Sequence, residues 1–279
     1  MKPEPADKSV KVRRADVIAA ARSVVIVLGD TVLFHSSLSS MGTVVGGPHT
    51  VIDGFLDAVG PDGTVAVPTL WWHQTSPPLR LEDWHIEESP SYTGLITEAF
   101  RKRPDSVRSD NPTHSVSAIG ARARELTCDH GKSGLRPCLF GDAAFAHQSP
   151  WQRLYDWDAA CCFIGVDFTV NTMGHYAETV YAERALTHCT PERRAGLEAR
   201  LQRWEKPGVW PRHSFQAMGE RLAAMGLVRF GKVGSAILRC IRARQMVDAI
   251  LAVLDEEPEQ WFGSDFLAWL AEASQRTVV

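Results

Sequence analysis

The stretch CCFIGVDFTVNTMGHYAET, residues 161–179, joins a run of apolar residues to a polar segment with helical spacing. CCFIGV, residues 161–166, is short and continuously apolar, which is typical of a strand buried in the centre of a sheet. The polar pair at 171–172 can cap the start of a following helix. In that helix His175 and Glu178, three residues apart, would lie on the same face. The stretch therefore predicts a buried strand followed by a helix with a histidine–carboxylate pair.

The histidine of this pair has two interpretations at this stage. A histidine near the end of a buried strand is commonly structural, with its ring satisfied by a neighbouring carboxylate, and the residues of this stretch alone favour that interpretation. Alternatively, His175 exchanges a proton during a reaction, because histidine titrates near neutral pH.

Strands and helices alternate on both sides of this stretch. Short apolar runs predict strands at residues 32–36 and 63–68. Apolar residues with helical spacing predict helices at 15–21, 51–59, 92–104, 175–187, 215–226, 237–258 and 265–273. Residues 73–92 are expected to form a long surface loop, and residues 190–213 are polar and irregular. This alternation predicts a layered α/β domain.

The composition is that of an ordinary globular protein, since 44% of the 279 residues are hydrophobic and 23% are charged. The formal net charge of -3 argues against nucleic acid or an anionic membrane as a partner. No apolar run approaches the ~20 residues of a membrane span, and the charged N-terminus lacks the apolar centre of a signal peptide. We expect a cytoplasmic protein with a flexible arm at residues 1–14 and a single domain at 15–279, as a monomer or homodimer.

The cysteines give no sign of a metal site or a disulfide framework, because none of the six forms a C-x-x-C pair. Cys161 and Cys162 lie in the apolar run, where burial would raise the pKa of a thiol and weaken it as a nucleophile. No G-x-S-x-G motif is present, so a hydrolase of that type is unsupported. We therefore expect no metal.

A glycine cluster, GTVVGG at residues 42–47, lies between a predicted strand and a predicted helix. Glycine allows close backbone approach, and the start of a helix offers free N–H groups, so the cluster could hold a phosphate or a polar amide chain. An ordinary tight turn is the alternative, because the spacing fits neither common phosphate-binding motif. The polar run HSSLSS, residues 35–40, follows the preceding strand, where ligands bind in α/β sheets.

Four blocks of sequence, taken in order, resemble the aminoglycoside 3-N-acetyltransferase family. They are FHSSLSSMGTVVGGPHTVIDGFLDAVGPDGTVAVPT (34–69), NPTHSVSAIGARA (111–123), SPWQRLYDWDAACCFIGVDFTVNTMGHYAE (149–178) and GKVGSAILRCIRARQMVD (231–248). The resemblance covers roughly residues 15–255. It implies a layered α/β/α domain with a central mixed sheet, distinct from the fold of the common acetyl-CoA acetyltransferase superfamily.

The resemblance also implies a reaction: direct transfer of acetyl from acetyl-CoA to the 3-amino group of an aminoglycoside antibiotic, which confers resistance. In the family the histidine of the NTMGHYAE block is the general base, so His175 takes that role. A downstream acid orients it. Glu205 in RWEKPGVW is the nearest match, with a solvated surface charge as its alternative, and Glu178 is the candidate from the same motif. Acetyl-CoA is the co-substrate, and no metal is required.

The remaining site residues also follow from the resemblance. The cofactor side is expected to include His35, Ser36, Ser37, Val45, Gly46, Gly47, Thr69, His114 and Ser115. Many family members have a His-Pro pair where this chain has Asn111-Pro112. On the substrate side, Trp72, Glu82 and Asp83 offer an aromatic face and carboxylates to a cationic aminosugar.

Two alternatives stay open. The stretch LWWHQTSPP, residues 70–78, lacks the acid that some relatives place there, so the substrate could be another amine, such as one on a secondary metabolite. The uncertain partner of His175 also leaves open a CoA-binding protein without catalytic turnover.

Overall fold

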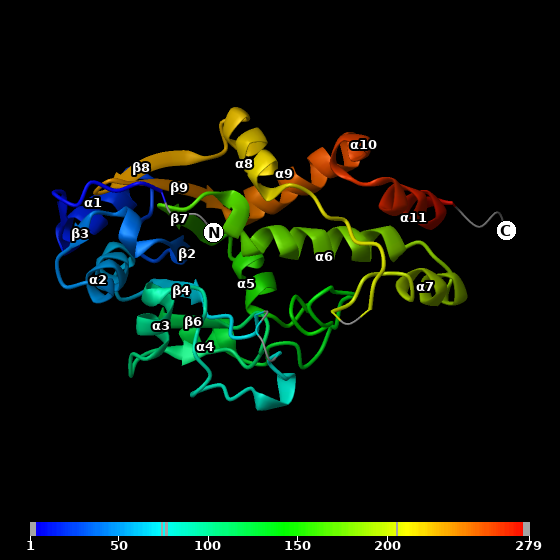
Figure 1. Cartoon of the computed structure of the whole chain (residues 1–279), viewed down its shortest axis with the longest axis horizontal. Coiled ribbons are helices and arrows are strands. Elements are labelled where there is room, and N and C mark those ends of the chain that lie inside the picture. The colour runs from blue at the N-terminus through cyan, green and yellow to red at the C-terminus, as the bar shows by residue number, and fades with distance from the viewer. Residues whose placement is uncertain (1–3, 74, 76–77, 205, 276–279) are drawn as a thin grey trace.

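One mixed sheet of seven strands forms the centre of the described part of the chain, residues 4–73, 75, 78–204 and 206–275 of a computed structural model (Figure 1). From edge to edge the strands are β5 (Val107–Arg108), β6 (Val116–Gly120), β4 (Thr64–Pro68), β2 (Thr31–Ser36), β7 (Ala160–Ile164), β9 (Ala236–Arg242) and β8 (Arg229–Val233). β2 pairs in parallel with β4 and β7, and the other pairs are antiparallel. The predicted central mixed sheet is confirmed.

The strand predicted at residues 161–166 is β7, and every residue in it is buried. Its register with β2 places His35 opposite Phe163 and Ser36 opposite Ile164. Because β2, β4 and β7 are parallel, their carboxyl ends meet at the same edge of the sheet. That edge is where ligands bind in α/β proteins.

Helices cover both faces of the sheet, and Figure 1 shows α1 and α2 on one side and α6 and α9 on the other. The first face is covered by α1 (Arg14–Ser23), α2 (Pro48–Val59) and α3 (Leu95–Arg101). The second is covered by α4 (Ala123–Thr127), α5 (Pro150–Asp156), α6 (Thr172–Leu186) and α9 (Ala243–Glu256). Side chains of β7 alternate between the two cores, with Phe163 in one and Ile164 in the other. The α/β/α layering is confirmed.

The helix predicted at residues 237–258 is wrong over residues 237–242. Residues 236–242 form β9, and α9 begins only at Ala243. Exposure of side chains alternates along most of β9, as it does in a strand with one covered face. Pairing with the backbone of β7, where Cys240 lies opposite Cys162, decides the conformation of a segment whose apolar spacing also fits a helix.

The C-terminal part of the chain adds further helices. The segment 190–213, predicted to be irregular, contains the helix α7 (Pro191–Glu198). Thr190 caps its start, because the side chain of Thr190 accepts a hydrogen bond from the backbone N–H of Arg193. Three more follow: α8 (Phe215–Ala224), α10 (Pro258–Trp261) and α11 (Ser264–Ser274). Among the described helices, none is both long enough and apolar enough to cross a membrane.

The described part of the N-terminal segment, from Glu4 on, runs beside the loop that contains the glycine cluster. β1 (Lys11–Val12) pairs in parallel with β3 (Thr43–Val44). The carboxylate of Glu4 accepts a hydrogen bond from Arg239 at 2.8 Å. The expected flexibility of residues 1–14 stays a prediction.

Candidate functional site

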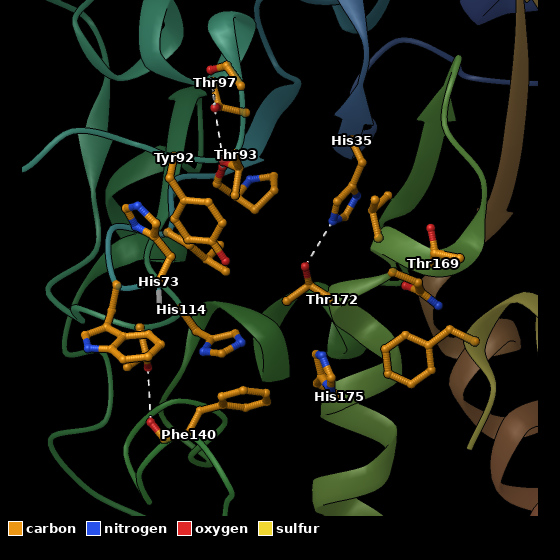
Figure 2. Close-up of a pocket in the computed structure, with 18 of the residues that line it drawn as sticks. His35, His73, Tyr92, Thr93, Thr97, His114, Phe140, Thr169, Thr172 and His175 are labelled. Atoms are coloured by element: carbon orange, nitrogen blue, oxygen red, sulfur yellow. Dashed lines mark hydrogen bonds between the residues drawn. The ribbon is translucent and has the colours of Figure 1, made fainter. Parts of the chain in front are cut away.

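A cavity of about 590 Å³ opens at the sheet edge where β2, β4 and β7 end. This volume is typical of sites that bind small molecules. Its walls are formed by His35, Ser36, Pro68, Leu70, Trp72, His73, Tyr92, Thr93, Gly94, Thr97, Thr113, His114, Phe140, Thr169, Val170, Asn171, Thr172, His175, Trp204 and Phe215. The chain thus brings strand ends, the first turn of α6 and several loops to one place (Figure 2).

His175 lies in the first turn of α6, at the wall of the cavity. The connection from β7 runs through a 3-10 turn (Phe168–Val170), and α6 begins after Asn171, whose backbone is extended. The ring of His175 packs edge-on against Phe140 and Phe215, with centroids 4.8 and 4.7 Å away. Its side chain keeps 28% of its surface exposed, so a ligand can reach it.

Glu178 is the partner of His175. It is buried, and its Oε2 accepts hydrogen bonds from His175 Nδ1 at 2.9 Å and from Trp210 Nε1 at 3.1 Å. His213 Nδ1 lies 3.6 Å from the other carboxylate oxygen. Because Nδ1 of His175 is held by the carboxylate, Nε2 is the nitrogen left for the cavity. A histidine held in this way by a buried carboxylate can act as a general base.

His114 faces His175 from the opposite wall, and Figure 2 shows the two rings on either side of the cavity. The ring centroids are 6.2 Å apart and the ring planes are nearly perpendicular. Burial among aromatic rings lowers the pKa of His114 well below its ordinary value, and the positive charge that His175 can carry adds to this effect. His114 therefore stays neutral at physiological pH.

Polar atoms at the β2 end of the cavity lack partners. His35 Nε2 lies 3.1 Å from the hydroxyl of Thr172, and burial lowers the pKa of His35 to about 3. Within the described residues, His35 Nδ1, Ser36 Oγ and Asn171 Oδ1 are buried without a hydrogen-bond partner. Buried polar groups are normally paired, so this wall suits a ligand that supplies hydrogen-bonding groups.

The other residues expected on the cofactor side do not line the cavity. Thr69 and Ser115 are buried, and the Ser115 hydroxyl donates to the Thr69 carbonyl oxygen at 2.7 Å. Ser37 accepts a hydrogen bond from the hydroxyl of Ser40 at 2.9 Å. Val45, Gly46 and Gly47 lie just before α2. Both glycines have positive φ, which favours glycine. Their role in cofactor binding stays a prediction.

The substrate-side residues are separated by the structure. Trp72 lines the cavity and contacts Trp204 edge to face. Glu82 and Asp83 lie on the surface, where both pair with Arg80, and neither lines the cavity. Their role in substrate binding stays a prediction. Glu205, the predicted downstream acid, lies outside the described residues.

Several cavity residues were missed by the sequence reasoning. Phe140, Tyr92 and Phe215 come from loops or from the start of a helix, far apart in the chain. Trp210 and His213, which surround Glu178, come from the segment predicted to be irregular. One local signal could have indicated them. Aromatic residues and histidine recur in polar segments without a helical or strand period, where they are less easily explained as residues of the core.

Comparisons with known proteins show the family and the fold. The family model described as aminoglycoside 3-N-acetyltransferase matches residues 33–255. The chain is 30% identical over 260 residues to aminoglycoside N(3)-acetyltransferase VII of Streptomyces paromomycinus, covering 82% of this chain and 86% of that protein. The crystal structure of aminoglycoside acetyltransferase AAC(3)-Xa is 25% identical with a TM-score of 0.69, covering 89% of this chain and 94% of that one. AAC-IIIb, solved as a binary complex with CoASH, is 20% identical with a TM-score of 0.68, covering 91% and 98%.

Proposed function

The chain belongs to the aminoglycoside 3-N-acetyltransferase family, and on that premise we propose that it transfers acetyl directly from acetyl-CoA to the 3-amino group of an aminoglycoside, with His175 as the general base. The observation that carries this proposal is the bond between His175 Nδ1 and the buried carboxylate of Glu178, at the wall of a cavity of about 590 Å³. The carboxylate fixes the orientation and the tautomer of the ring.

The proposed reaction needs no covalent enzyme intermediate. The neutral amine of the substrate attacks the thioester carbon while Nε2 of His175 takes a proton from the amine. A carbon–nitrogen bond forms, the carbon–sulfur bond breaks, and the sulfur leaves as a thiolate. The imidazolium of His175, held by Glu178, can then return the proton to that thiolate. At the end of the cycle the enzyme has the same protons and the same covalent structure as at the start.

Support for acetyl-CoA comes from the β2 end of the cavity. His35, Ser36 and Asn171 each present a buried polar atom without a partner in the described residues. The pantetheine arm of CoA carries amide groups that can donate and accept hydrogen bonds. The fold is shared with AAC-IIIb, which was solved with CoASH. We propose that acetyl-CoA enters from this end and directs its thioester toward His175.

A second candidate substrate is an amine with few charges, such as one on a secondary metabolite. Among the described residues that line the cavity, none is Asp or Glu, whereas histidine, threonine and aromatic residues are frequent. Carboxylates are the usual partners of the ammonium groups of a polycationic ligand. This observation favours testing less charged amines beside the antibiotics.

The proposal is tested by a steady-state assay that follows release of free thiol from acetyl-CoA. Gentamicin, kanamycin, apramycin and a set of simple amines would serve as acceptors. We expect His175→Ala to lower turnover by about 10²–10⁴-fold, the size of general base catalysis. His188→Ala is the control, since His188 is exposed and lies outside this cavity. Near-normal turnover by His175→Ala would remove His175 from the mechanism.

A further inference from the structure

We propose that His114 donates a hydrogen bond from Nε2 to the carbonyl oxygen of the thioester as that oxygen becomes negatively charged. The inference rests on the proposed acetyl transfer and assigns a second histidine to it. A base removes the proton of the amine, but negative charge also develops on the carbonyl oxygen, and donors aimed at that oxygen are usually a large part of catalysis.

The positions of the two histidines fit these two roles, with His175 at the amine and His114 at the carbonyl oxygen. Their ring centroids lie 6.2 Å apart across the cavity. In a productive approach the attacking nitrogen lies about 3 Å from the carbonyl carbon, and the attacking nitrogen and the carbonyl oxygen each need a ring nitrogen at about 3 Å. The amine and the thioester can therefore both lie on the side of the two histidine rings that is open to the cavity. Phe140 covers the pair on another side, with centroids 4.4 Å from His114 and 4.8 Å from His175.

The ring of His114 is free to make this bond. Within the described residues it has no hydrogen-bond partner: Nδ1 is buried and unpaired, Nε2 is not among the atoms buried without a partner, and the residue lines the cavity. We therefore assign the bond to Nε2. By contrast, Nε2 of His35, the other buried histidine of the wall, already lies 3.1 Å from Thr172 Oγ1. A buried polar ring without a partner is uncommon in folded proteins and indicates a ligand.

The backbone of His114 is held firmly, as a preorganised donor requires. Its N–H donates to Asn111 Oδ1 at 2.8 Å, and its carbonyl oxygen accepts from Trp151 Nε1 at 2.9 Å. Asn111 also accepts from the N–H and the hydroxyl of Thr113. Asn111 thus fixes the turn that presents the ring. His114 itself is only 4% exposed.

The two rings have different surroundings. Nδ1 of His175 lies 2.9 Å from the buried carboxylate of Glu178. His114 is enclosed by Phe140, Phe145 and Trp151, and burial holds its pKa well below the ordinary value. Two titratable groups whose environments differ in this way commonly have different roles. A neutral imidazole still has one N–H to donate, and it does not compete with His175 for the proton.

The test compares two amide substitutions at one position. The side-chain amide of Gln reaches roughly the position of Nε2, and that of Asn roughly the position of Nδ1. We expect His114→Gln to keep kcat within about tenfold of the wild type. We expect His114→Asn to lower kcat by about 10²–10³-fold, the usual cost of losing one such donor. Neither variant should change the Kd of CoA measured by calorimetry more than twofold, and the shape of the pH–rate profile should be kept.

The control is His130→Gln. His130 is another buried histidine, but it bonds to Ser109 and the Ala144 carbonyl and does not line the cavity. It should lose stability without losing kcat. Equal kcat for His114→Asn and His114→Gln would overturn the inference, as would a weaker Kd for CoA that accounts for the loss. A wild type without acetylation activity would overturn the proposed function as well, whereas an active wild type with an active His114→Asn variant overturns this inference alone.

Discussion

Replacing Glu178 by glutamine removes one negative charge from the site and leaves the shape of the side chain. In the native protein Oε2 of Glu178 lies 2.9 Å from Nδ1 of His175 and accepts a second bond from Trp210. In the proposed mechanism the carboxylate acts on the rate, because His175 would gain a positive charge while the amine attacks. Glutamine can still accept from Trp210, but it no longer opposes the new charge.

The size of the effect follows from this distance. Two unit charges at 2.9 Å attract each other by about 6 kcal/mol at an effective dielectric constant of about 20. The His175 side chain is 28% exposed, so water screens part of this attraction. We expect a loss of about 3–4 kcal/mol in transition-state stabilisation, which is about a 10²–10³-fold fall in kcat.

The assay is the thiol-release assay at saturating acetyl-CoA, together with thermal unfolding of each variant. Glu183→Gln is the matched control. Glu183 lies on the same helix and pairs with Arg136 at 2.7 Å and with His147 at 2.9 Å, but it does not line the cavity. We expect it to lower Tm without lowering kcat. A folded Glu178→Gln enzyme with kcat within threefold of the wild type would refute the electrostatic role given to Glu178.

Two further predictions concern stability. Burial lowers the pKa of His35 to about 3 and that of His130 to about 4, while a histidine in the unfolded chain titrates near 6.5. The unfolded chain therefore binds more protons below about pH 6.5, and the free energy of unfolding should fall by up to about 1.4 kcal/mol per pH unit for each histidine as the pH drops toward 4. Urea titrations at pH 7, 6 and 5 measure this, and a constant value would contradict it. A methyl group added at Gly219 would overlap the ring of Phe168, so Gly219→Ala should cost about 1–3 kcal/mol. Gly196→Ala is the control, because a methyl group there would meet open space, and it should leave Tm unchanged or raise it. Equal Tm values for the two variants would contradict the predicted overlap at Gly219.

The parts of the site that could be predicted from the sequence are those set by local spacing. An apolar run followed by a polar cap places a strand before a helix, and a separation of three residues puts His175 and Glu178 side by side. The structure gives them a hydrogen bond of 2.9 Å. Neither the burial of Glu178 nor its contact with Trp210 follows from spacing, because the two residues are 32 positions apart and meet only through the packing of the chain.

The parts that were missed depend on tertiary pairing. The residues 237–242 have an apolar spacing that fits a helix, and only their hydrogen bonds to β7 make them a strand. The substrate role expected of the acids at 82–83 stays a prediction, but their place on the surface, where both pair with Arg80 and neither lines the cavity, does not follow from their charge. Charge and aromatic content identify side chains that could bind a ligand, whereas their direction is decided by contacts between distant segments.

The burial of α6 has a consequence for how the site is lost when the protein unfolds. Most of its residues are buried, on both sides of the histidine, and the helix packs against α9, α11 and α5. We therefore expect the amides of its central turns to exchange with solvent slowly, as amides in a cooperative core do. In the proposed mechanism the ring that accepts the proton stands on this helix, so we expect fraying of a loop or a terminus to leave it in place and global unfolding to displace it.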